Sequence, residues 1–420
     1  MKTVPIYLIL IAFWLENVLG LRLTPWRGLS FFNVALYFSF MACLFSSNKI
    51  RAINRRSNPY KYLIILTVVM VCSVVVKWIL GQVPIEPLEE IILFKDWLNP
   101  FLCLFIVFTL VDDEKSALRV IYALAIVLVA TILAELLVTY GLMSIGRIQV
   151  TIEGRAAGFA EANQYAAYLV LMLPLLVSFF FLSKHPLHRF LVLGGYFVGL
   201  TALVVTGSRG GLVSYAFSVL VLFSLLSRNR IIRMDKGVIL LAALLLLVVA
   251  SAALAPRQVT EGLSRKMDVR EARDVSGFTS GRLTILQNGL ELFVEHPFIG
   301  NGFNAFMPLV TKKYHMKFIS HNEYLGYLVN QGILGCIFFI ALFVSILKRF
   351  LRLTRNRFDP HWQIIYIGYV AGLAGYMVAM LAVNITNPAV LFWMYTGALY
   401  GASNLKTAQM AFEAMQRNGR

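Results

Sequence analysis

A histidine in the run Ser320-His321-Asn322-Glu323 has the type and the setting of a general base. Ser320 followed three residues later by Glu323 forms a capping box, so the pattern predicts a helix that begins here with His321 in its first turn. The positive end of a helix dipole favours the neutral form of a histidine in that position, and a neutral imidazole accepts a proton. The alternative is a histidine that only caps a membrane helix and meets water at the interface.

Two arginines occupy comparable positions at the starts of predicted helices. Arg209 follows Ser208, a predicted helix cap within the short glycine-rich run 206–211, and Arg282 follows the run 279–281 in the same way. A guanidinium group beside the free N–H groups of a helix start binds anions, and two such sites suit a diphosphate. The alternative for each arginine alone is an anchor at the membrane interface.

Further polar residues are predicted on the same side of the membrane. Arg147 and Arg155 precede the run 161–164, which contains Asn163 and opens the sixth apolar segment. The positive-inside rule disfavours an arginine in an outer loop as short as 207–210. The clustering of these residues therefore favours a binding site over a set of separate anchors.

Membrane helices must position these residues. Of the 420 residues, 59% are hydrophobic and 14% are charged, and the mean hydropathy is +0.74. About twelve candidate spans of about 20 residues follow one another, which is the length that crosses a bilayer as a helix. The sequence therefore predicts an all-α polytopic membrane protein with a single membrane domain over residues 1–420. The spans lie at roughly 4–20, 29–47, 60–81, 91–111, 117–140, 163–183, 188–206, 210–227, 236–255, 322–347, 361–383 and 388–404.

The charge distribution predicts the orientation of these spans. Lysine and arginine concentrate in the short loops on the side of the two termini, which the positive-inside rule assigns to the cytoplasm. The basic runs that give the net charge of +17 are therefore orientation signals rather than a nucleic-acid site. Residues 256–321 then form one long outer loop between spans nine and ten.

Two segments of this loop have helical periodicity. In 281–296 the predicted apolar face consists of Leu283, Leu286, Leu290 and Phe293, and a second stripe runs through 303–317. Both segments are too short and too polar to span a membrane. We expect two amphipathic helices that lie across the outer mouth of the bundle or in the membrane interface.

Few ionisable or metal-binding residues lie within the spans. Lys77 is expected to extend its amine to the interface beside Trp78, whereas Glu135 would face a cavity or pair with a base. No acidic or histidine chain crosses the midplane, which argues against a proton-coupled transporter. The four cysteines lie in apolar spans without metal-ligand spacing, so neither a disulfide nor a metal site is expected.

Several of these runs together resemble the superfamily of O-antigen ligases and Wzy-type polymerases. They are Ser208-Arg209-Gly210-Gly211, Ser280-Gly281-Arg282, the run 296–302 and His321-Asn322 followed by Gly332 and Gly335. The resemblance implies a bacterial inner-membrane glycosyltransferase whose active site faces the periplasm. It would transfer a glycan from undecaprenyl diphosphate to an acceptor hydroxyl, without a cofactor or a metal. The 256–321 loop would then be periplasmic and would carry part of the active site.

The resemblance also implies catalytic roles, with Arg209 and Arg282 at the diphosphate and His321 at the acceptor. We expect the remaining substrate contacts to come from Arg155, Arg147, Asn163, Ser208, Asn322 and Glu323. The partners expected are the lipid-linked donor, lipid A–core oligosaccharide as acceptor, and membrane lipids, with no nucleic acid.

Three alternatives stay open. A Wzy-type polymerase would use the same donor but a second lipid-linked repeat unit as acceptor. A polysaccharide or lipid exporter would need polar groups through the midplane, and the predicted spans are nearly bare of them. A scaffold whose outer arginines are only anchors is the third alternative.

Overall fold

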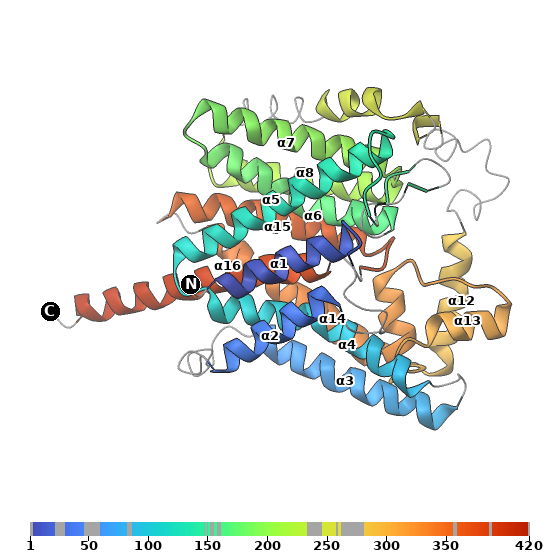
Figure 1. The fold of residues 1–420 in the computed structure, drawn as a ribbon. Coiled ribbons are helices and arrows are strands. Elements are labelled where there is room, and N and C mark those ends of the chain that lie inside the picture. Colours follow the sequence, from blue (N-terminus) through green and yellow to red (C-terminus); the bar gives the residue numbers. More distant parts are fainter. Residues whose placement is uncertain are drawn as a thin grey trace.

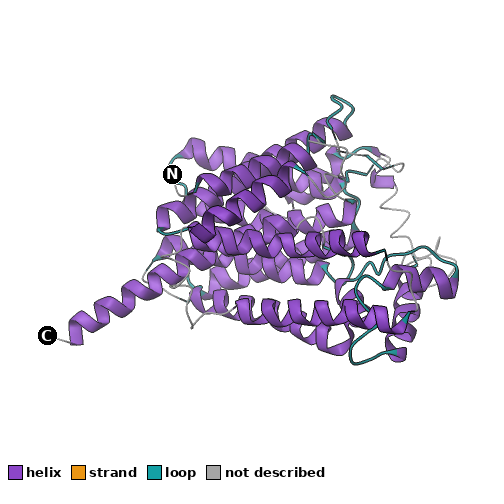
Figure 2. Cartoon of the chain, turned by 60° about the horizontal axis from the view of Figure 1, so that its bottom comes forward, coloured by secondary structure: helices purple, strands orange, loops and turns teal. Residues whose placement is uncertain are grey.

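The computed structural model shows a bundle of helices, and the described residues form no strand (Figure 2). It describes residues 3–418 except 22–29, 46–58, 82–85, 147, 149, 152–154, 158–160, 233–245, 258, 262–280, 356–358 and 386–388. The helices are α1 (Val4–Asn17), α2 (Phe31–Phe45), α3 (Pro59–Leu80), α4 (Pro87–Leu110), α5 (Glu114–Thr139), α6 (Ala162–Leu182), α7 (Pro186–Val205), α8 (Arg209–Arg228), α12 (Arg282–Glu295), α13 (Phe306–Tyr314), α14 (Glu323–Leu353), α15 (Pro360–Ala379) and α16 (Ala389–Asn418).

Within the described residues, eight helices are long and apolar enough to cross a membrane, namely α3 to α8, α14 and α15. The helices α1 and α2 are apolar but shorter. Half of the predicted ninth span, residues 236–245, lies outside the described residues, so the number twelve stays a prediction. The α4 helix is continuous although it contains Lys95, Asp96 and Pro100.

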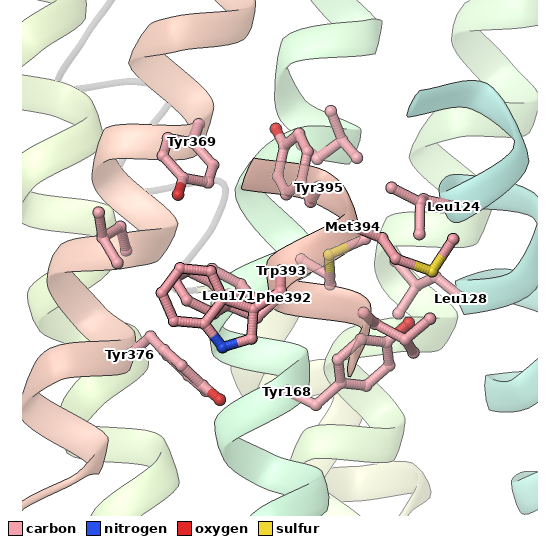
Figure 3. Close-up of a cluster of buried hydrophobic side chains, with 14 of the residues drawn as sticks. Leu124, Leu128, Tyr168, Leu171, Tyr369, Tyr376, Phe392, Trp393, Met394 and Tyr395 are labelled. Atoms are coloured by element: carbon pink, nitrogen blue, oxygen red, sulfur yellow. The ribbon is translucent and has the colours of Figure 1, made fainter. Parts of the chain in front are cut away.

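The centre of the bundle is formed by α6 and α15, which pack at very short range. An added Cβ at Gly372 of α15 would lie 2.2 Å from the carbonyl oxygen of Leu171 on α6. Small residues allow membrane helices to approach in this way. Around this contact, buried aromatic rings of α14, α15 and α16 pack edge to face, such as Tyr369 and Tyr395 with ring centroids 4.9 Å apart (Figure 3).

The helices α12 and α13 lie together at one end of the bundle (Figure 1). At the opposite end α1 begins and α16 ends, so both termini lie away from α12 and α13 (Figure 1). The two segments predicted to be helical, 281–296 and 303–317, contain α12 and α13, whereas their place between a ninth and a tenth span on the periplasmic side stays a prediction.

The α12 helix buries a face different from the predicted one. Its buried residues are Ile285, Gly289 and Leu292, whereas Leu283, Leu286 and Leu290 are exposed. The helix carries two apolar stripes, and the one with fewer large side chains is buried because it packs against α14. An added Cβ at Gly289 would lie 2.8 Å from the side chain of Leu325 on α14, so the glycine allows this close approach.

The prediction for Lys77 was wrong. Its side chain does not extend to the interface but is buried and ion-paired with Glu90 of α4. The reason is that α4 begins at Pro87, before the predicted residue 91, and this earlier start brings Glu90 against α3. A buried ammonium needs such a partner, because an unpaired charge away from water is costly.

Candidate functional site

Two predicted arginines meet at the starts of separate helices. Arg209 is the first residue of α8, and the hydroxyl oxygen of Ser208 accepts a hydrogen bond of 3.2 Å from the Gly211 N–H, so the predicted cap is confirmed. Arg282 is the first residue of α12. Its Nη1 lies 3.7 Å from the position of an added Cβ at Gly210, so its guanidinium group reaches the neighbour of Arg209.

Arg155 joins these two arginines from the segment before α6. Its Nε donates a hydrogen bond of 2.7 Å to the carbonyl oxygen of Thr206, and its Nη2 donates one of 3.2 Å to Oδ1 of Asn163. The amide of Asn163 in turn donates to Glu161. This chain of contacts fixes Arg155 beside the turn that precedes Arg209. Arg155, Arg209 and Arg282 are called the arginine cluster below.

The charges of the cluster act on one another. Burial lowers the pKa of Arg282, and the positive charge of Arg209 lowers it further, whereas Glu161 opposes this shift. The Arg282 side chain has no hydrogen-bond partner among the described residues. Positive charge therefore predominates where the three guanidinium groups meet Glu161. A dianion such as a diphosphate diester would balance this charge.

The prediction that His321 lies in the first turn of a helix was wrong. The helix α14 begins at Glu323, and Asn322 caps it by accepting a hydrogen bond of 3.1 Å from the Leu325 N–H. His321 precedes the cap with φ of 45°, in the left-handed region. The Glu323 carboxylate does not complete a capping box, because it accepts a hydrogen bond of 2.9 Å from the Ile385 N–H.

His321 nevertheless lies next to the arginine cluster and has the electrostatics of a base. Its ring is half-buried, and Nδ1 is buried without a hydrogen-bond partner in the described part of the chain. Burial lowers the pKa of His321, Glu161 raises it, and Arg282 lowers it again. The net shift is downward, so the neutral form is favoured as predicted. Burial is the main cause, not the helix dipole.

The segment that carries His321 is held by residues of the loop after α15, which lies more than 60 positions further along the sequence. The buried Ser320 hydroxyl accepts a hydrogen bond of 2.7 Å from Nδ2 of Asn384, which follows α15. In the same stretch, an added Cβ at Gly210 would lie 3.0 Å from Cβ of Ala382. The 382–385 segment therefore connects the start of α8 with the start of α14.

A loop between α12 and α13 fixes these two helices to α14. The α14 helix is broken at Gly332, where φ is 67° and ψ is −168°. The 297–302 loop enters this break, and the Asn301 N–H and the Gly302 N–H donate to the carbonyl oxygens of Val329 and Asn330. An added Cβ at Gly332 would lie 2.4 Å from the backbone of Phe298. Gly332, one of the two glycines of the family-like pattern, is therefore required by the close approach of this loop.

Two residues of the site were missed from the sequence. Glu161 lies in the predicted 161–164 run, but a single carboxylate at the start of a span gives no sign that it faces both Arg282 and His321. Asn384 lies in the loop after α15 and carries no pattern at all. Its role depends on Ser320, which is distant in the sequence.

The remaining predicted substrate-binding residues fall into two groups. The side chains of Ser208, Asn322 and Glu323 all bond to backbone N–H groups, so they shape the starts of α8 and α14. Arg147 lies outside the described residues, as do residues 279 and 280 of the run before Arg282. Substrate contacts by these residues stay predictions.

Comparison with known protein families identifies one match. Residues 194–340 match the family model described as O-antigen ligase. This region is an O-antigen ligase domain. It contains Arg209, Arg282 and His321, whereas Arg155 and Asn163 precede it. No curated protein matches the chain.

The O-antigen ligase domain and the apolar helices give the class of the protein. A domain of this family within a bundle that has eight membrane-length helices indicates a multi-pass bacterial membrane protein. The family indicates a membrane glycosyltransferase that acts on lipid-linked glycans. The predicted superfamily is thus confirmed.

Proposed function

We propose that this protein is an O-antigen ligase-like glycosyltransferase of the bacterial inner membrane. It transfers a glycan from undecaprenyl diphosphate to lipid A–core oligosaccharide on the periplasmic face. The observation that carries this proposal is the meeting of the arginine cluster with His321, because these residues come from four separate segments and Glu161 acts on both Arg282 and His321. An anion site beside a buried neutral histidine suits a reaction that expels a diphosphate and removes a proton from a hydroxyl.

The arginine cluster is proposed to bind the donor's diphosphate. Each phosphate of a glycosyl diphosphate lipid carries one negative charge, and the positive charge that predominates at the cluster attracts this pair. More negative charge develops on the diphosphate as its bond to the sugar breaks. Fixed guanidinium groups in a partly buried site stabilise this charge without having to reorganise. The cluster therefore accelerates departure of the lipid diphosphate and does not require a metal ion for this step.

His321 is proposed to act as the general base. The acceptor oxygen attacks the anomeric carbon and forms the new glycosidic bond, while the bond from that carbon to the phosphate oxygen breaks. The electron pair leaves with undecaprenyl diphosphate, and the proton of the acceptor hydroxyl moves to the unpartnered Nδ1 of His321. This single displacement inverts the anomeric centre. NMR spectra of donor and product test this step, and an unchanged anomeric configuration contradicts it.

The identity of the acceptor is tested with purified protein and an undecaprenyl-diphosphate repeat unit, with and without lipid A–core. EDTA is present throughout, so that any transfer occurs without a metal ion. The proposal predicts that product forms only when lipid A–core is added and is attached to it. A ladder that forms from the lipid-linked donor alone would instead identify a Wzy-type polymerase. Failure to transfer to either acceptor, by protein shown to be folded, would favour an exporter.

A further inference from the structure

A cavity of about 520 Å³ lies between α1, α2, α4, α14 and α16, and the active-site segments close part of it. This volume lies within the range of ~300–1,000 Å³ that is typical of ligand pockets. Its wall includes Glu323 and Asn384, which hold the segment of His321. The cavity therefore has one wall in common with the proposed catalytic site.

The lining of this cavity has a chemistry opposite to that of the arginine cluster. The carboxylates of Glu16 and Asp96 lie in its wall, and none of the described lining residues is a lysine or an arginine. A diphosphate would meet like charge here, and the ammonium group of Lys95, 3.0 Å from Oδ1 of Asp96, is already held by that carboxylate. The cavity is thus unsuited to the charged part of the donor and suited to a ligand with hydroxyl groups, which donate hydrogen bonds to carboxylates.

Amide and aromatic side chains complete the lining and are held in fixed orientations. Nδ2 of Asn99 donates a hydrogen bond of 2.9 Å to Oδ1 of Asn33, and the Tyr37 hydroxyl donates one of 3.0 Å to Oδ1 of Asn99. Nε1 of Trp97 donates to the Tyr327 hydroxyl at 3.1 Å. Such fixed side chains bind a ligand at a small cost in conformational entropy.

The aromatic side of the cavity forms a short row. The rings of Trp97 and Phe101 have centroids 4.9 Å apart, and those of Phe101 and Trp393 lie 5.1 Å apart, both edge to face. Aromatic faces next to amides and carboxylates provide both apolar contact and hydrogen bonds. A sugar ring needs this combination, because its C–H groups are apolar and its hydroxyl groups are polar.

The 382–385 segment links this cavity to the arginine cluster and holds the residues that flank His321 and Asn322. At one end Ala382 packs against Gly210, next to Arg209. At the other end Asn384 and Ile385 line the cavity and bond to Ser320 and Glu323, the residues on either side of the pair that contains His321. A ligand in the cavity would therefore contact residues that hold the segment of His321, and a ligand on the cluster would lie near His321 through Arg282.

We propose that this cavity is the acceptor site and binds the uncharged, hydroxyl-rich end of the acceptor glycan, whose attacking hydroxyl reaches His321. This inference rests on the proposed transferase function. The cavity then selects the acceptor by its sugar rings, while the arginine cluster selects the donor by its diphosphate.

The test separates the Michaelis constants of the two substrates in purified full-length protein. Asp96→Asn and Trp97→Phe should each raise the KM of the acceptor about tenfold, which is the effect of losing one charge-assisted hydrogen bond or an oriented aromatic contact. The KM of the donor should stay unchanged. Asp112→Asn and Trp78→Ala are the matched controls, because neither residue lines the cavity.

Three outcomes decide the inference. A raised acceptor KM in the two cavity variants, with normal donor KM, supports it for lipid A–core and for a lipid-linked acceptor alike. An unchanged acceptor KM, or a raised donor KM, overturns it and leaves the transferase function standing.

If the wild-type protein transfers no glycan, the proposed function fails, and direct binding then decides the role of the cavity. Free core oligosaccharide is titrated into the protein while tryptophan fluorescence is recorded. Binding that weakens about tenfold in Asp96→Asn retains the cavity as a glycan site. The absence of binding by the wild-type protein overturns the inference.

Discussion

At the scale of single residues, burial rather than a fixed partner favours the neutral form of His321 that the proposed base role needs. Its Nδ1 is buried and has no partner among the described residues, and burial lowers its pKa while Glu161 and Arg282 act in opposite directions. A histidine held by a carboxylate would be more basic but would also be protonated more often. The position of His321 favours the neutral ring, which a general base requires before the reaction.

The pH dependence of the reaction tests this role. The profile of kcat/KM should fall on the acid side below the ordinary pKa of histidine, because the pKa of His321 in the free protein is lowered and protonation removes the base. The acid limb of kcat should lie at higher pH, since bound diphosphate favours the imidazolium form.

His321→Ala should lower kcat by about 10²- to 10⁴-fold and abolish the limb. His188→Ala, at an exposed histidine of α7, is the control. An acid limb that persists in His321→Ala contradicts the assignment.

The arginines are tested by separating charge from shape. Arg209→Lys and Arg282→Lys keep a positive charge but lose the planar fork that pairs with two phosphate oxygens. We predict that each lowers kcat/KM by about 10- to 100-fold, and that alanine lowers it further. The exposed Arg257 provides a control variant, Arg257→Ala, with normal activity. Kinetics with the lipid-linked donor measure the effect. Lysine variants with full activity would show that only diffuse positive charge is needed.

At the scale of elements, the residues of the candidate site lie at helix starts, and contacts with loops from distant parts of the sequence hold these helix starts in place. The periodicity of the sequence predicts α12 and α13, but not which stripe of α12 is buried, because that choice depends on the contact of Gly289 with Leu325. The capping box at Ser320 was wrong for a similar reason. Its hydroxyl bonds to Asn384, and such a contact between distant residues leaves no local pattern. The helix starts at Arg209 and Arg282 were predictable, since helix starts carry local signals.

The break in α14 provides the prediction at this scale. Gly332→Ala should lower the thermal unfolding temperature strongly, because its φ and ψ are strained for any other residue and its Cβ would meet Phe298. We expect a loss of ~3 kcal/mol or more in stability, with loss of transfer as α12 moves away from α14. Gly141→Ala is the matched control, since Gly141 also has positive φ but nothing lies within 4 Å of its Cβ. The control should lose only ~1–2 kcal/mol. Equal losses in the two variants contradict the role of the loop contact.

At the scale of the whole molecule, the site lies at the end of the bundle that carries α12 and α13, away from both termini (Figure 1). Charges of the short loops predict that the termini are cytoplasmic. Together these two points predict that lipid-linked donor and acceptor meet the protein at its periplasmic face. The apolar bundle beneath the site holds the ends of α6, α8, α14 and α15 in fixed relation.

The orientation is measured by labelling single cysteines in intact cells. The exposed Cys72 is first replaced by alanine, since it would react by itself. Lys312→Cys on α13 should react with a membrane-impermeant maleimide in cells whose outer membrane has been opened. A cysteine added after Arg420 should react only once the inner membrane is also permeabilised. The reverse pattern contradicts the periplasmic placement of the site.

The central claim is that the arginine cluster and His321 together transfer a glycan from a lipid diphosphate. The most direct measurement is the single-turnover rate of glycan transfer by purified wild-type protein and by Arg282→Ala, with saturating undecaprenyl-diphosphate repeat unit and lipid A–core. The account predicts transfer with release of undecaprenyl diphosphate by the wild-type protein, and a loss of at least about 100-fold in folded Arg282→Ala. Equal rates for the two proteins would contradict it.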